Sequence, residues 1–375
     1  MKPIFFDLKR EGDVRELKKL ERAEKIVFVS DDYEEQLREY FAVCNPTLVY
    51  TPEFENHFKK YFKNIEKKTP LKKHGKWVFY PWLSTLVHIL EDKAFQAVRT
   101  ARNRNLINIG EQGKFYNSSI GIAGLSVGNS VALAIAFQGG GKHIKLADHD
   151  SLALSNTNRV RAGIQNLGLP KVEITARQIY ELNPYAKIEL FGDGINKKNI
   201  SKFFKGLSIV IDEIDNLAVK YLIRVEAQKN KIAVVMAADN GDNAVVDVER
   251  YDNDPQPEFF HGRIGEVSYE MLFGLDKFGI GKMITKHVGP ENVTERMRQS
   301  LLEMGKTIVS WPQLGGAALV NGAAVAYCVR KILNGEPIES NRALISMDEK
   351  LIPGYNSAEE VAKREESVRE FKKIF

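Results

Sequence analysis

The strongest constraint on this chain is a regular alternation of short apolar segments and helical segments that begins at Ser118. The apolar runs have strand length and occupy residues 120–123, 143–147, 187–191, 208–212 and 232–237. Alternation of this kind is typical of an α/β fold in which a mostly parallel sheet carries helices on both faces. The wholly apolar run 232–237 fits a strand that is buried on both faces. The sequence therefore predicts a doubly wound, mostly parallel sheet.

The pattern divides the 375 residues into three parts. Residues 1–100 mix β-type runs, such as 25–30 and 76–81, with helical stretches near 11–24, 32–43 and 52–65. They predict a smaller α+β module, for which peptide recognition is one interpretation. Residues 101–335 hold the doubly wound domain and end in a Gly- and Ala-rich segment that predicts a buried helix. Residues 336–375 are predicted to form a charged helical tail. Between Lys59 and Lys76, a lysine-rich run is either a solvated helix face or a docking surface for an acidic peptide.

Composition excludes several classes of protein. A net charge of +5 is mild for this length and gives no reason to expect a nucleic-acid partner. No apolar stretch approaches the roughly 20 residues of a spanning helix, and no signal-peptide core is seen, so we expect a cytoplasmic protein without membrane contact. Cys44 and Cys328 lie far apart, which predicts no disulfide framework and no cysteine zinc site. Both are interpreted as buried free thiols.

A glycine loop connects the first predicted strand to the following helix and contains Gly124, Ser126 and Gly128. Backbone N–H groups at a helix N-terminus suit a phosphate, although Gly124 and Gly128 would also serve a tight turn and helix packing. Asp148 ends the next predicted strand, where nucleotide-binding folds place an acid on ribose hydroxyls. Asp150 is either a ligand contact or a turn cap. These features fit NAD and ATP equally.

Three charged residues further along the chain favour ATP. An adenylylating site must neutralise a triphosphate while a carboxylate oxygen attacks the α-phosphorus, which requires an arginine, a lysine and a metal-binding aspartate. Arg159, Lys171 and Asp215 supply that set. An NAD-dependent oxidoreductase, the alternative, would leave all three unused.

The order of these motifs resembles the ThiF/MoeB and ubiquitin-activating-enzyme family of adenylating enzymes. After the glycine loop come Asp148-His-Asp150, Leu154-Ser-Asn-Thr-Asn-Arg159, Leu169-Pro-Lys171 and Asp215-Asn216. The resemblance implies a Rossmann-like, ThiF-type fold that uses ATP and Mg²⁺. It also implies that Asp148 binds ribose, that Asp215 coordinates Mg²⁺, and that the phosphates are held by Asn156, Arg159 and Lys171.

The segment 100–106 resembles the arginine-bearing segment that this family places before the first strand. The resemblance implies that Arg104, or less favourably Arg102, reaches the γ-phosphate in the other protomer of a homodimer. Two features depart from the family. The glycine loop has fewer glycines than usual, and a Cys-x-x-Cys zinc site and a thioester cysteine are absent. We therefore expect no structural zinc and no thioester transfer.

The first functional hypothesis is adenylylation of a carboxylate on a peptide, with release of pyrophosphate, in the maturation of a ribosomally made peptide of the microcin or pantocin type. The alternatives are activation of a ubiquitin-like or sulfur-carrier protein, an NAD-dependent oxidoreductase, and a non-catalytic nucleotide-binding protein. His261 is a candidate general base, and Asp239 is a candidate wall of the substrate channel. His149 is interpreted as a loop residue that points away.

Overall fold

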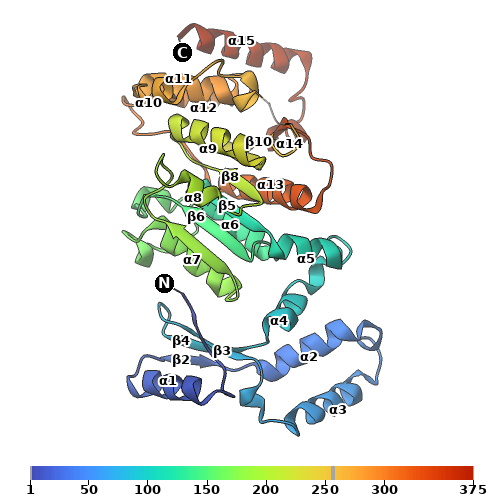
Figure 1. Ribbon diagram of the computed structural model, residues 1–375. Coiled ribbons are helices and arrows are strands. Elements are labelled where there is room, and N and C mark those ends of the chain that lie inside the picture. The colour runs from blue at the N-terminus through green and yellow to red at the C-terminus, as the bar shows by residue number, and fades with distance from the viewer. Residues whose placement is uncertain (1, 255–257, 375) are drawn as a thin grey trace. The chain divides into compact units, whose positions relative to one another are not determined.

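The computed structural model describes residues 2–254 and 258–374 (Figure 1). The chain forms two compact units, which are described separately. Unit 1 contains Met1–Gln112 and Tyr180–Tyr185, and unit 2 contains Gly113–Ile179 and Ala186–Phe375. An acidic loop predicted over residues 252–260 falls partly on 255–257, outside the described residues.

Unit 1 is built around a four-stranded sheet in the order β1-β3-β4-β2. Its strands are β1 (Ile4–Phe6), β2 (Phe28–Ser30), β3 (Lys76–Tyr80) and β4 (Thr85–Ile89). β3 is antiparallel to β1 and β4, whereas the edge strand β2 runs parallel to β4. The helices are α1 (Glu11–Arg22), α2 (Tyr33–Cys44), α3 (Phe54–Glu66) and α4 (Asp92–Arg99). The first three lie where the sequence predicts helices, but β1 and β4 were not predicted.

Unit 2 contains a seven-stranded sheet in the order β11-β10-β9-β8-β5-β6-β7, which confirms the predicted fold class. Five strands are parallel: β5 (Ser119–Ala123), β6 (His143–Ala147), β7 (Lys187–Phe191), β8 (Ile209–Asp212) and β9 (Ala233–Asn240). β10 (Asn243–Glu249) and β11 (Asn341–Ile345) extend the sheet in antiparallel fashion. β11 lies in the segment predicted to be wholly helical, so that part of the prediction is wrong.

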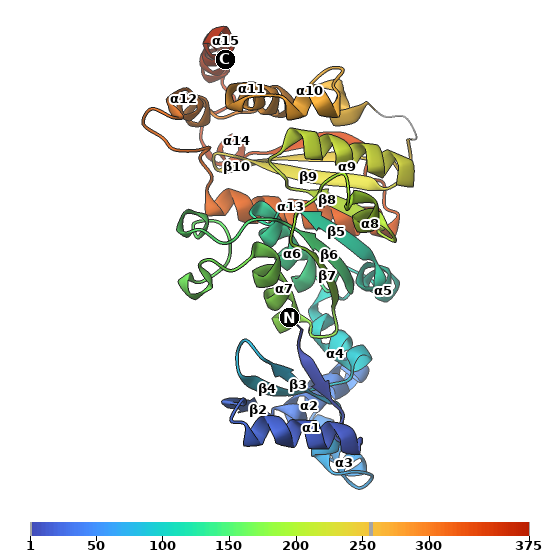
Figure 2. The same cartoon turned by 60° about the vertical axis from the view of Figure 1, so that its left-hand side comes forward.

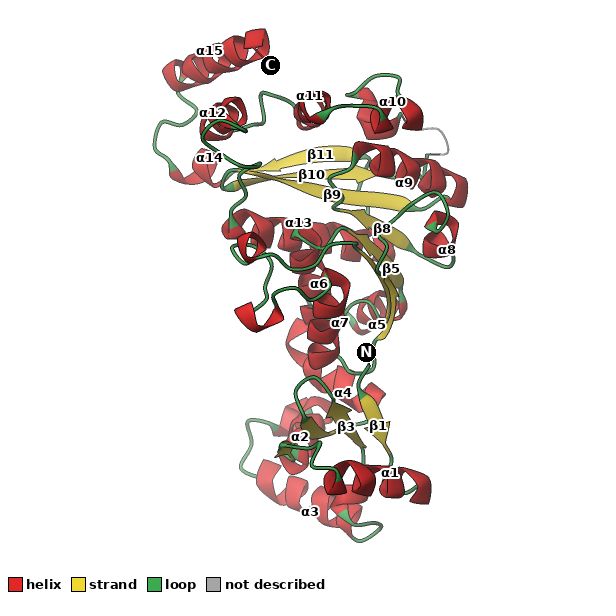
Figure 3. Cartoon of the chain, turned by 90° about the vertical axis from the view of Figure 1, so that its left-hand side faces the viewer, coloured by secondary structure: helices red, strands yellow, loops and turns green. Residues whose placement is uncertain are grey.

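Helices cover both faces of this sheet, as Figures 2 and 3 show. One face packs against α6 (Val127–Phe137) and α13 (Gly315–Asn334). The other carries α8 (Ile200–Phe204), α9 (Leu217–Asn230) and α11 (Lys277–Val288). The remaining helices of the chain are α5 (Ile109–Asn117), α7 (Lys171–Leu182), α10 (Tyr269–Phe273), α12 (Glu295–Glu303), α14 (Met347–Leu351) and α15 (Ala358–Ile374).

The Gly- and Ala-rich segment forms α13, as predicted, and packs closely on α6. A Cβ atom at Gly322 would lie 2.8 Å from the backbone carbon of Ser130, so only glycine fits there. Within the described residues, α13 is the one helix whose length and composition would allow it to cross a membrane. Its packing on α6 and the sheet buries one apolar face of the helix. Cys328 on this helix is half-buried, whereas Cys44 is exposed, contrary to expectation.

Candidate active site

The predicted functional residues of unit 2 follow the carboxyl ends of neighbouring parallel strands. β5 lies between β6 and β8, so the chain turns away in opposite directions at this point of the sheet. Ligands of doubly wound folds bind outside the strand ends at such a switch point. Gly124 follows β5, Asp148 follows β6, and Asp215 follows β8.

Gly124 allows the glycine loop to approach the segment after β8. Its φ angle is +85°, and a Cβ atom there would lie 2.3 Å from the backbone oxygen of Glu213. Both the conformation and the close approach therefore require glycine. Gly128 is less restricted, because a Cβ atom there would lie 3.2 Å from the side chain of Ile122. Gly128 packs α6 against the sheet, and its predicted contact with phosphate remains a prediction.

Asp148 ties the glycine loop to the end of β6. One carboxylate oxygen accepts a hydrogen bond from the backbone N–H of Leu125 at 2.6 Å, and the other accepts from the N–H of Asp150 at 2.8 Å. Asp148 is only 9% exposed. Each carboxylate oxygen can accept a further bond. The predicted ribose contact is thus compatible with this structural role but remains a prediction.

Arg159 reaches the glycine loop from the segment after β6. Its Nε donates to Ser126 Oγ at 2.9 Å, and Nη1 donates to the backbone oxygen of Ser155 at 3.1 Å. Asn156 shapes this segment, because its side-chain oxygen accepts from the N–H of Ala153 at 3.1 Å. That contact uses the amide oxygen of Asn156 and leaves its NH₂ group as the part that suits a phosphate.

Lys171 is the first residue of α7 and is about 5% exposed. Its Nζ lies 2.9 Å from Asp150 Oδ2, and this hydrogen bond lowers the pKa of the Asp150 carboxyl below its ordinary value. Asp150 itself is exposed and also lies 3.4 Å from His149 Nε2. His149 is a solvent-facing loop residue, as expected.

Asp215 shares an electrostatic environment with the predicted cations. Part of its surface is exposed, but surrounding protein atoms desolvate the carboxyl group and raise its pKa. The charges of three cations lower this pKa; in decreasing order of effect they are Lys220, Lys171 and Arg159. The charges of Lys171 and Arg159 thus both act on Asp215, and the joint role of the three residues at a triphosphate remains a prediction.

Asp239, near the end of β9, interacts electrostatically with Arg159 and Asp215. Its carboxylate accepts from the side chains of Gln313 and Asn321, which lie just before α13 and in its first half. Burial raises the pKa of Asp239 to about 6, against the hydrogen bonds and the charge of Arg159. In the sequence, only its position at the end of the apolar run 232–237 indicated that Asp239 could line the substrate channel.

A buried ion network under the loop after β8 was not predicted. Arg224 is fully buried and pairs with Asp212 and with Glu249, the latter at 2.7 Å. Lys220 Nζ lies 3.3 Å from Asp212 Oδ2, and Asp212 Oδ1 accepts from the N–H of Ile214 at 3.3 Å. The network therefore fixes the start of the loop that carries Asp215.

His261 lies elsewhere, which corrects its assignment as a candidate base. Its Nε2 is 3.4 Å from Asp247 Oδ1 on β10. Asp247 is the register partner of Met236, whereas Asp239 pairs with Ala244 three positions further along. Because side chains alternate along a strand, Asp247 and Asp239 point to opposite faces of the sheet. His261 thus belongs to the face covered by α11, away from Arg159.

Arg104 follows a short 3₁₀ helix (Ala101–Asn103) in unit 1. Its predicted role at the γ-phosphate remains a prediction.

Among the described residues, Asp148, His149 and Asp150 form a group whose ligand atoms lie within 4.8 Å of one another. Asp148 and Asp150 already have protein partners, so this group does not by itself define a metal site.

A doubly wound sheet with a glycine turn and a charged cluster at its switch point defines the class of nucleotide-binding α/β domains. Residues 100–257 match the sequence model of the ThiF family, and the chain carries a ThiF family domain. The resemblance inferred from the motifs is therefore confirmed.

Three curated relatives illustrate the range of similar proteins. "Uncharacterized protein MT1398" of Mycobacterium tuberculosis is 34% identical over 86% of this chain and 45% of its own length. The tRNA threonylcarbamoyladenosine dehydratase of Escherichia coli is 35% identical over 32% of this chain and 45% of its own length. The adenylyltransferase and sulfurtransferase MOCS3 of Drosophila willistoni is 33% identical over 33% of this chain and 28% of its own length. The chain thus spans less than half of each relative.

Among solved structures, E. coli MccB with MccA-N7isoASN is 18% identical. The match covers 64% of this chain and 64% of the MccB chain, with a TM-score of 0.46.

Proposed function

We propose that the ThiF family domain adenylylates a carboxylate at the expense of ATP. The observation that carries the proposal is the shared electrostatic environment of Arg159, Lys171 and Asp215 beside the Gly124 loop. Two cations suit the charge of a triphosphate, and a carboxylate among them suits Mg²⁺. NAD chemistry would give no role to this combination.

In the proposed reaction, a carboxylate oxygen of the substrate attacks the α-phosphorus of ATP. The new oxygen–phosphorus bond replaces the bond to the bridging oxygen, and pyrophosphate leaves with that electron pair. Arg159 and Lys171 hold the phosphates and stabilise charge on the leaving group. Asp215 would hold Mg²⁺, which when bound neutralises phosphate charge. Asp148 keeps the glycine loop in place through its bond to the Leu125 N–H.

A peptide is the first candidate for the carboxylate substrate. The chain carries an additional α+β unit with a cavity and a basic rim, which an enzyme acting on a small metabolite would not need. The second candidate is a threonylcarbamoyladenosine group of tRNA, because the E. coli dehydratase is 35% identical over 124 residues. Activation of a ubiquitin-like or sulfur-carrier protein is the third, supported by the similarity to MOCS3.

The active unit in this proposal is a homodimer. α13 buries one face, but leaves an apolar stripe on the other that includes Leu319, Val320, Ala323 and Tyr327. Leu319 is 62% exposed and Tyr327 is 47% exposed. Apolar residues at helical spacing on a surface mark an interaction site. A second copy of the chain would also supply Arg104 in trans.

The experiment measures nucleotide binding first. Calorimetric titration with ATP and Mg²⁺ is expected to show binding that Arg159→Ala, Lys171→Met and Asp215→Asn each weaken at least about tenfold. Arg161→Ala is the matched control, because the Arg161 guanidinium is exposed and lies over the Phe137 ring at 5.5 Å. Equal binding of NAD⁺ and ATP, or no effect of the three substitutions, would contradict the proposal.

The second stage tests chemistry. Labelled pyrophosphate should enter ATP in the presence of a peptide pool, and in this reaction Arg159→Ala should be inactive. Exchange supported by bulk tRNA and not by peptides would favour the second candidate. ATP binding without exchange in either pool would identify a non-catalytic nucleotide-binding protein.

A further inference from the structure

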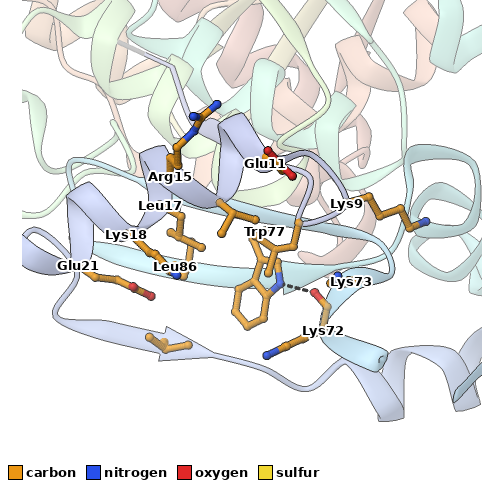
Figure 4. A pocket seen from close by; sticks show the side chains of 13 residues that line it. Lys9, Glu11, Arg15, Leu17, Lys18, Glu21, Lys72, Lys73, Trp77 and Leu86 are labelled. Carbon is orange, nitrogen blue, oxygen red and sulfur yellow. Dashed lines mark hydrogen bonds between the residues drawn. The ribbon is translucent and has the colours of Figure 1, made fainter. Parts of the chain in front are cut away.

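Unit 1 contains a cavity of about 830 Å³ whose base is apolar (Figure 4). Leu17 of α1, Trp77 of β3 and Leu86 of β4 form this base and are buried in one cluster. The Trp77 indole Nε1 donates to the backbone oxygen of Lys72 at 2.9 Å, which fixes the ring. Trp77 also stacks on His88 with ring centroids 4.4 Å apart. A preformed apolar surface of this kind loses little freedom when it binds a ligand.

The rim of the cavity is basic. Five cations line it and two acids, Glu11 and Glu21, oppose them. None of the five has an ion pair within 4.0 Å in the described part of the chain; they are Lys9, Arg15, Lys18, Lys72 and Lys73. By contrast, Lys76 of the same lysine-rich segment is already paired with Asp7 and Glu91. The rim therefore presents uncompensated positive charge to a ligand.

An open strand edge borders the same cavity. β2 is the last strand in the order β1-β3-β4-β2, and its Val29 lines the cavity. The residues of β2 are exposed, and Val27 and Phe28 are more than 60% exposed. Such an edge has unpaired N–H and C=O groups that can pair with another extended segment. The Phe28 N–H points to the Ser84 oxygen, so the adjacent Val29 N–H points outward.

We propose that unit 1 binds an extended peptide segment that carries both apolar and acidic side chains. The segment pairs with β2, places an apolar side chain over Trp77, and places carboxylates opposite the five cations of the rim. The charge of the rim selects against basic peptides, and the apolar base selects against purely hydrophilic ones. This inference rests on the proposed function only for the role of the peptide as substrate.

Fluorescence anisotropy with the full chain, without ATP, tests the binding. Four labelled probes are compared: a decapeptide of Glu, Leu and Phe, one with Lys in place of Glu, one of Glu, Ser and Gly, and bulk tRNA. The first is expected to bind at least tenfold more tightly than the other two peptides, with an affinity that falls as salt rises. Equal binding of the peptides, or binding of tRNA alone, would overturn the proposal.

Variants locate the site. Lys72→Glu with Lys73→Glu should weaken binding of the acidic apolar peptide at least tenfold. Lys59→Glu with Lys60→Glu is the matched control, because it changes net charge equally on the exposed face of α3, outside the cavity, and should alter affinity less than twofold. Val29→Pro removes the backbone N–H group of β2 that points outward, and leaves the net charge unchanged. It should also weaken binding of the acidic apolar peptide. Equal loss in both double variants would show a general charge effect and overturn the site.

Hydrogen exchange supplies a readout that does not depend on folding of any variant. In the wild-type chain, saturating acidic apolar peptide should protect backbone amides at residues 27–30. Protection confined to other segments would refute pairing with β2. ATP binding separates this inference from the proposed function, because Arg159→Ala should weaken ATP binding at least about tenfold and leave peptide affinity unchanged.

Discussion

At the scale of single residues, the site combines groups that the fold requires with groups that the proposed chemistry requires. Gly124 is of the first kind, since neither its φ angle nor its contact with Glu213 permits a side chain. Arg159 and Lys171 are assigned to the second kind, because the proposed reaction requires cations that hold the phosphates. Asp148 belongs to both, since it ties the glycine loop to the end of β6 and is predicted to bind ribose.

Gly124→Ala is expected to destabilise the chain by about 2–4 kcal/mol, since a left-handed residue with a Cβ and an overlap with backbone both cost free energy. Gly168→Ala is a matched control, because its φ angle is +81° but a Cβ there has nothing within 4 Å. It should cost only about 1–2 kcal/mol. Urea unfolding followed by circular dichroism measures both. Equal losses would mean that the contact with Glu213 is unimportant.

Asp239 predicts a pH dependence of stability. Its pKa is about 6 in the folded chain, against an ordinary value of 3.8 for a solvated aspartate, so the folded state holds the proton more tightly than the unfolded state. The resulting stabilisation is present below about pH 4 and is lost as pH rises through 6. Asp239→Asn cannot titrate. Between pH 4 and pH 7.5, the stability of the variant should therefore rise relative to wild type by roughly 2.5 kcal/mol. A constant difference across this range would contradict the assignment.

At the scale of elements, the sequence was informative where periodicity and burial agree. The apolar run 232–237 predicted β9, and the small residues of 314–333 predicted α13. β4 was missed, because His88 interrupts its apolar pattern and is buried only through partners in Asp31 and His74. The ion pair of Arg224 with Asp212 was not predicted from the sequence. Their burial depends on pairing between α9 and β8, which no local pattern reveals.

Arg224→Met is expected to destabilise the chain by about 3–5 kcal/mol, because it leaves the carboxylates of Asp212 and Glu249 buried without their shared partner. Lys229→Ala on the same helix is the control. The Lys229 side chain is exposed and pairs with Glu226. Loss of this ion pair should lower the free energy of unfolding by less than about 1 kcal/mol. Urea unfolding compares the two. A loss near that of Lys229→Ala would show that the network does not stabilise α9.

At the scale of the whole molecule, the predicted functional residues are divided between two compact units, and the proposed function requires two copies of the chain. Arg159, Lys171 and Asp215 lie in unit 2, whereas Arg104 and the basic cavity lie in unit 1. Sequence patterns predicted the roles of Arg104 and of the three residues in unit 2, but could not say which protomer supplies Arg104, because that depends on association between chains. The exposed stripe of α13 provides a separate test of association.

Leu319→Asp with Tyr327→Asp should convert a dimer to a monomer, because it introduces charge into the proposed apolar interface. Val309→Asp is the control, since Val309 is 99% exposed and lies outside α13. Light scattering after gel filtration reports the mass of each variant. A wild-type monomer, or a dimer that survives the double substitution, would exclude α13 as the interface.

Mixing two inactive variants tests whether Arg104 acts in trans. The Arg104→Ala protomer lacks the arginine that, in this proposal, reaches the active site of its partner. The Arg159→Ala protomer lacks the arginine that binds phosphate in its own active site. A mixed dimer then contains one complete site. In this site, the Arg104→Ala protomer supplies its own Arg159 and the Arg159→Ala protomer supplies Arg104. Random exchange of equal amounts makes about half of the dimers mixed, so about a quarter of wild-type pyrophosphate exchange should return. If Arg104 acts within its own protomer, every site in the mixture lacks one arginine and activity stays at the level of the separate variants.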